Sequence, residues 1–110
     1  MTLGIIEVDK KGTITRNGLQ LGVIEKNGDV FSSDKKLIGI IHDNGNIFSV
    51  KNGMTGIVQE SGNIFSTKHG LIGQLKENGT IYSIKKGQVG LFKGNLRKIG
   101  GLLLLFFDQF

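Results

Sequence analysis

Few residues in this 110-residue chain could carry out catalysis. His42 and His69 are its two histidines, and a serine recurs four times at one interval. These serines are Ser32, Ser49, Ser66 and Ser83. A serine can act as a nucleophile when a histidine lies beside it as the base. A serine repeated four times is more typical of a structural position, because only one copy could meet a given histidine. We therefore predict that the chain has no catalytic residues and is not an enzyme.

The sequence also contains few residues that could bind a metal ion or a cofactor. The chain has no cysteine, which excludes disulfides, thiolate metal sites and a cysteine nucleophile. The acidic residues near the turns lack the spacing of a calcium-binding loop. The Asn-Gly pairs lie between strand-like segments, whereas phosphate-binding glycine loops lead into a helix. We expect no metal and no cofactor.

Basic residues are the polar groups with the most regular placement. Lys51, Lys68 and Lys85 recur at an interval of 17 residues, and the formal net charge is +5. Further basic residues lie at the same set of turns, where Asp34 is the one acid: Arg16, Lys35, Lys36 and Lys86. Charged turns can simply prevent aggregation of strand edges. Alternatively, they can bind an anionic ligand such as nucleic acid or a lipid headgroup.

The same 17-residue interval organises the whole chain. One series of glycines consists of Gly22, Gly39, Gly56, Gly73 and Gly90. A second series consists of Gly28, Gly45, Gly62 and Gly79. We divide residues 1–95 into units at about 4–21, 22–38, 39–55, 56–72 and 73–89, with a partial unit at 90–95. Stacked repeats of this kind form one continuous array, and deviating terminal copies cap it.

Each unit is predicted to contain two short strands and two tight turns. Asn44-Gly45 and its equivalents indicate two-residue hairpin turns, because a type I′ turn requires positive φ at both central residues. An odd repeat would exchange the two faces of a sheet at every unit. Either the second turn therefore has three residues, giving an antiparallel meander, or the units wind as a β-solenoid. In the meander we expect Phe48 to lie opposite Gly56.

Both faces of such a sheet are apolar. Aromatic residues recur at one position of the unit: Phe31, Phe48, Phe65 and Tyr82. An aromatic row can stack ligands, but we expect these residues to belong to the core. A sheet with two apolar faces needs a cover on each side, since an uncovered apolar patch favours association.

The segment 96–110 is the predicted cover for one face. A helical stripe runs through it at Leu96, Ile99, Leu103, Phe106 and Phe110. Asn95 is a suitable N-cap, whereas Gly100-Gly101 weakens a helix and leaves an additional strand as the alternative. A second copy of the chain is the predicted cover for the other face.

The sequence thus predicts an all-β protein of tandem 17-residue hairpins, forming an antiparallel meander that could be curved or closed, with a β-solenoid as the alternative. Its predicted role is a structural or protein-interaction module that self-associates, in the cytoplasm. Leu103, Phe106, Phe107 and Phe110 are the candidate interaction residues. Binding of an anionic polymer or headgroup through Lys51, Lys68 and Lys85 is the second possibility. The longest apolar run, Leu102–Phe107, is far shorter than the ~20 residues of a membrane-spanning helix.

Overall fold

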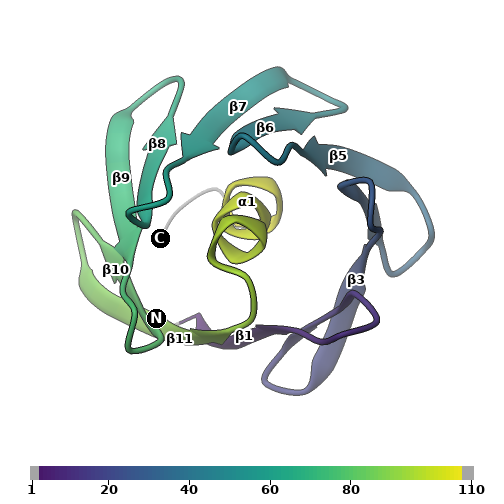
Figure 1. Cartoon of the computed structure of the whole chain (residues 1–110), viewed down its shortest axis with the longest axis horizontal. Coiled ribbons are helices and arrows are strands. Elements are labelled where there is room, and N and C mark those ends of the chain that lie inside the picture. The colour runs from purple at the N-terminus through teal and green to yellow at the C-terminus, as the bar shows by residue number, and fades with distance from the viewer. Residues whose placement is uncertain (1–2, 108–110) are drawn as a thin grey trace.

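A computed structural model describes residues 3–107, which form eleven strands and one helix. The strands close into a barrel, and the helix lies inside the ring that they make (Figure 1). The strands are β1 (Gly4–Val8), β2 (Thr13–Arg16), β3 (Leu19–Ile24), β4 (Asp29–Ser32), β5 (Leu37–Ile41), β6 (Asn46–Ser49), β7 (Gly53–Val58), β8 (Asn63–Ser66), β9 (Gly70–Leu75), β10 (Thr80–Ser83) and β11 (Gly87–Lys93). The helix, α1, spans Leu96–Phe106.

The strands follow one another around the barrel as an antiparallel meander, which confirms the hairpin prediction over the solenoid. Closure joins the first and last strands. Because the number of strands is odd, β1 and β11 point the same way and pair in parallel, with Gly4 opposite Gly90 and Ile5 opposite Leu91. Closure gives every strand a neighbour on both sides. The backbone N–H groups of each strand are therefore needed for hydrogen bonds to its neighbours.

The turn that contains Asn44-Gly45 has three residues, not the predicted two. His42 N–H donates to the Asn46 carbonyl, and Gly45 N–H donates to the His42 carbonyl. Gly45 alone of the loop residues has a positive φ, of 94°, and the Asn44 side chain accepts a hydrogen bond from Asn46 N–H. This is the three-residue hairpin in which a left-handed glycine follows a type I turn.

The longer turn moves the pairing by one residue. Ile41 lies opposite Ile47, and Phe48 lies opposite Ile40 and Met54. The predicted position of Phe48 opposite Gly56 is also wrong, because a register shift in the β6–β7 pair places Ile47 there. The phenylalanine points outward, and the isoleucine points into the barrel.

One β-bulge per unit compensates for the odd repeat. In the β6–β7 pair the register shifts between Ile47 and Phe48, which leaves Thr55 as the additional residue of β7. Equivalent shifts occur in the pairs β2–β3, β4–β5, β8–β9 and β10–β11. A bulge places two residues of one strand opposite one of its partner. Because of the bulge, the equivalent isoleucine or valine points into the barrel in every unit.

The repeated serine has a structural role at the second turn, as predicted. Ser49 Oγ accepts hydrogen bonds from Lys51 N–H at 3.1 Å and Asn52 N–H at 3.2 Å. Ser66 and Ser83 accept from the equivalent N–H groups of their own loops. A hydroxyl that satisfies two loop N–H groups stabilises a tight turn.

The core is a layer of aliphatic side chains around α1. Buried isoleucine or valine recurs opposite each glycine of the first series; these pairs are Ile14–Gly22, Val30–Gly39, Ile47–Gly56, Ile64–Gly73 and Ile81–Gly90. The helix packs most closely on β7 and β5, and it also contacts β1 and β6. It contributes the fully buried side chains of Ile99, Leu102 and Leu103 to the same core.

Glycines allow the helix to approach the barrel wall closely. A Cβ atom on Gly100 would lie 2.7 Å from Val58 Cγ1, and one on Gly101 would lie 2.6 Å from Ile41 Cδ1. Conversely, a Cβ atom on Gly56 would lie 2.7 Å from Leu104 Cδ1. The Gly100-Gly101 pair, which counted against a helix, is the condition for fitting this helix inside the barrel.

The helix begins where the repeat changes its turn. Asn95 stands 17 residues after Asn78, but Leu96 replaces the glycine that follows Asn78. Asn78 Oδ1 accepts from Thr80 N–H, two residues on. Asn95 Oδ1 accepts from the equivalent Arg97 N–H and from Lys98 N–H, as a helix N-cap does. Without the left-handed glycine, the chain continues into a helix, and the N-cap prediction is confirmed.

Within the described part of the chain, no helix combines the length and apolar composition needed to cross a membrane.

Candidate interaction surfaces

The outer wall of the barrel carries three cross-strand apolar groups of similar composition. In each group an outward-facing phenylalanine pairs with one aliphatic or methionine side chain on either side. The groups are Val23–Phe31–Leu37, Ile40–Phe48–Met54 and Ile57–Phe65–Leu71. We call these nine residues, which extend from β3 to β9, the outer band.

The fourth unit has polar residues at the same positions. Gln74 replaces Ile57, Tyr82 replaces Phe65, and Gln88 replaces Leu71, with the same strand pairing. The fold therefore accepts glutamine at these outer positions. The apolar residues of the outer band are not required by the hairpin geometry, and the band follows the outer wall from β3 to β9.

Several outer-band side chains remain open to solvent. Leu37, Met54, Ile57 and Leu71 have exposed fractions of 40%, 37%, 38% and 41%. Phe31, Phe48 and Phe65 are half-buried against these neighbours. The aromatic row therefore lies on the outer wall, and the expectation that it belongs to the core is wrong. The signal in the sequence was the one-residue offset between the inward isoleucines and the phenylalanines that follow them.

Lys51, Lys68 and Lys85 all lie exposed on separate loops of one rim of the barrel. We call this the basic rim; its loops follow β2, β4, β6, β8 and β10. Among the described residues it carries seven basic side chains, six on these loops and Arg16 at the end of β2. It carries one acid, Asp34, whose pKa is lowered chiefly by a hydrogen bond from the Ser32 hydroxyl. The loops of the opposite rim, together with the strand ends and the start of α1 beside them, carry acidic and basic residues in equal numbers.

The predicted tail residues occupy two different environments. Leu103 is 0% exposed in the core, so it packs against its own chain. Phe106 and Phe107 are half-buried at the end of α1, where the Arg16 guanidinium carbon lies 5.3 Å from the centre of the Phe107 ring. Arg16 belongs to the basic rim, so the helix ends at that rim. Phe110 lies outside the described residues.

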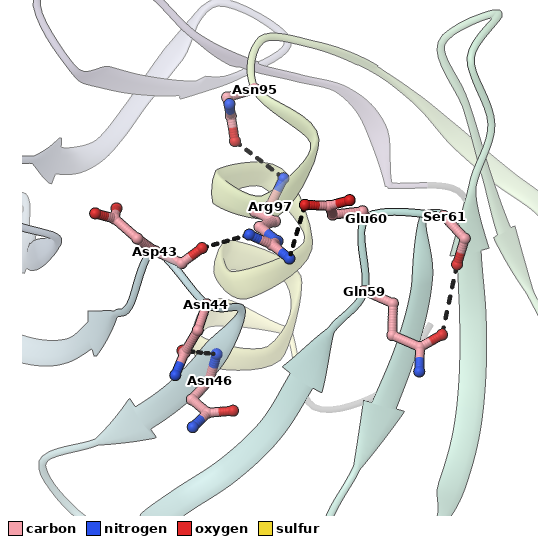
Figure 2. A network of polar contacts seen from close by, with 8 residues as sticks. All are labelled: Asp43, Asn44, Asn46, Gln59, Glu60, Ser61, Asn95 and Arg97. Atoms are coloured by element: carbon pink, nitrogen blue, oxygen red, sulfur yellow. Dashed lines mark hydrogen bonds and ion pairs between the residues drawn. The ribbon is translucent and has the colours of Figure 1, made fainter.

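Arg97 links the start of α1 to two loops of the opposite rim (Figure 2). Its Nη1 donates to the Asp43 carbonyl, and its Nη2 lies 3.7 Å from Glu60 Oε1. Its Nε is buried and makes no hydrogen bond in the structure. The contacts fix the helix entrance between the loops that follow β5 and β7. They are structural contacts of the helix with the barrel.

The two histidines do not share a site. The His42 ring packs edge-on against Phe48, with ring centres 5.1 Å apart, and His69 lies in a loop of the basic rim. Among residues 3–107, no group of three or more histidine, cysteine, aspartate or glutamate side chains could hold a metal ion.

Comparison of the chain with protein-family models, with curated proteins and with solved structures finds no match. The surfaces of the barrel therefore have to be interpreted from their own residues.

Proposed function

We propose that this chain is a non-enzymatic structural or protein-interaction module that self-associates through the outer band. The observation that supports the proposal is the row of three phenylalanine groups on the outer wall, each flanked by exposed aliphatic or methionine side chains. Contiguous exposed apolar surface is typical of interaction sites. The fourth unit supports it further, because Gln74 and Gln88 are compatible with the same fold.

A second copy of the chain is the partner that suits this surface. An isologous dimer uses the same patch on both subunits, so a row of similar apolar groups can pack against itself. A standard interface buries about 800 Å² per partner. That is about an eighth of the 6668 Å² accessible surface of the chain. The strands from β5 to β9 carry two of the three apolar groups, and α1 contacts β5, β6 and β7 from inside.

Replacing Ile57 and Leu71 with glutamine is expected to weaken self-association by at least about tenfold. Two exposed aliphatic side chains would be lost from the interface, at about 1–2 kcal/mol each. The barrel should keep its stability, because the fourth unit carries Gln74 and Gln88 at the equivalent positions. Sedimentation velocity gives the dissociation constant, and thermal unfolding gives the stability.

Leu19→Gln provides a matched control. Leu19 is 72% exposed but lies outside the outer band, so this change should leave self-association unaltered. Dissociation constants that are equal for the Ile57→Gln/Leu71→Gln variant and the native chain would show that the outer band is not the interface.

The basic rim supports a second candidate function, the binding of a polyanion. Among the described residues, six lysines on neighbouring hairpin loops and Arg16 at the end of β2, with one acid, give a positive field at this end of the barrel. Neighbouring units are two strands apart, which places equivalent lysines roughly 10 Å from each other around the rim. Such a ring of charge can follow a phosphate backbone or a layer of lipid headgroups.

Replacing Lys51, Lys68 and Lys85 with glutamine should weaken such binding and reduce its salt dependence. The slope of log affinity against log salt is expected to fall by roughly 0.9 per lost phosphate contact with duplex DNA. Titrations with a DNA duplex and with anionic vesicles measure this and separate the two ligands. The matched control replaces Lys10, Lys26 and Lys76 of the opposite rim, and equal losses in both variants would exclude the basic rim.

A further inference from the structure

Charge on the outer wall is divided between the two ends of the central units. On the face formed by β5–β9, the loops of the opposite rim carry Asp43 and Glu60 and no lysine or arginine. The loops of the basic rim on the same face carry Lys51 and Lys68 and no acid. The two acidic loops, which we call the acidic tips, and the two basic loops, which we call the basic tips, thus stand at opposite ends of the apolar wall.

From this arrangement, we infer that two copies pair through the β5–β9 wall with their barrel axes antiparallel. The inference rests on the proposed self-association through the outer band and adds its orientation. A two-fold axis in the contact plane, perpendicular to the barrel axes, would place Lys51 and Lys68 of each protomer beside Asp43 and Glu60 of its partner. Parallel axes would instead bring four lysines together at one end, and like charges at an interface disfavour that arrangement.

The surrounding charges leave the acidic tips able to meet a partner. Arg97 lies 3.7 Å from Glu60, but the Glu60 side chain stays 86% exposed. Arg97 approaches Asp43 through its backbone carbonyl, not through its carboxylate. On the neighbouring loops, Lys76 lies over the Tyr82 ring, with Nζ 4.5 Å from its centre, and Lys36 lies 4.0 Å from Asp34.

Charge reversal tests the orientation. The variants Lys51→Glu/Lys68→Glu and Asp43→Lys/Glu60→Lys should each self-associate at least about tenfold more weakly than the native chain, since each places like charges in contact. An equimolar mixture of the two should form a heterodimer, because one protomer is then acidic at both tips and the other basic. The variant that combines all four reversals should regain self-association.

The matched control is Lys85→Glu/Lys86→Glu, which makes the same change of net charge on the same rim but outside the β5–β9 face. It should self-associate as the native chain does. Circular dichroism establishes that each variant folds. The native chain provides a test without substitutions. Its self-association should weaken as the salt concentration rises, because salt screens exposed charge pairs.

The possible failures are distinct. If the native chain dimerises but neither reversal weakens it, or the mixture gains nothing over its components, the antiparallel orientation is wrong and the outer band remains the interface. If the Lys85→Glu/Lys86→Glu control weakens dimerisation equally, net charge and not orientation is responsible, which also overturns the inference. If the native chain stays monomeric, the proposed function and the orientation are both wrong.

Discussion

Replacement of Leu103 with alanine is expected to lower the free energy of unfolding by about 2–5 kcal/mol, the range for a leucine removed from a packed core. Leu103 is 0% exposed and lies on a helix that the barrel encloses. The opposite wall cannot collapse into the space, because its strands are fixed by pairing around a closed ring. Urea denaturation measures the loss.

This experiment also separates two roles for the same residue. A leucine that contacted a partner would change the dissociation constant and leave the unfolding of the monomer unchanged. As the reference for an exposed leucine, Leu19→Ala should change the stability by less than about 0.5 kcal/mol. If Leu103→Ala is as mild as Leu19→Ala, α1 does not occupy the interior of the barrel in solution.

Replacement of Gly56 with alanine is expected to destabilise the chain by about 3 kcal/mol, at the upper end of the usual effect of overpacking. The added Cβ would meet the Phe65 carbonyl of the adjacent strand and would lie 2.7 Å from Leu104 Cδ1 on the helix. A leucine end can rotate, but a carbonyl held in the β7–β8 ladder cannot move away. Denaturant unfolding gives the change in free energy.

Gly53→Ala in the same strand is the matched control. Gly53 has open space around its Cα but a φ of 73°, so alanine there meets only the backbone strain of about 1–2 kcal/mol. Gly56 is not among the glycines with a positive φ, so its substitution tests packing, whereas the substitution of Gly53 tests backbone strain. A loss for Gly56→Ala smaller than the loss for Gly53→Ala would mean that the wall and the helix do not require a glycine at position 56.

The sequence alone predicted the repeat, the meander and the start of the helix, because each depends on local signals. Glycines at a fixed interval mark turns, and Asn95 carries the turn signal without its glycine. The turn length was predicted wrongly, because Asn-Gly is compatible with both two-residue and three-residue hairpins. That one residue reverses the faces of Ile47 and Phe48, and so decides which side chains form the core and which form the outer band.

Two further features depend on tertiary structure that no local pattern contains. A bulge in each unit compensates for the odd repeat, and its position follows from the registers on both sides of a strand. The enclosed helix was predicted as a cover for one face, although the consecutive apolar residues Leu102–Phe107 were a sign of burial on all sides. As a result, Leu103 was assigned to an interaction surface, although it is buried in the core. Phe48 and Phe65 were assigned to the core for a different reason, because phenylalanine is usually buried.

The claim that the outer band joins copies of this chain is tested most directly by the mass of the unmodified protein in solution. Sedimentation velocity from low micromolar to several hundred micromolar concentration should show the mass rising from one chain to two. Adding the Ile57→Gln/Leu71→Gln variant to the series should shift this transition to higher concentration. A native chain that keeps the mass of one chain over the whole range would contradict the account.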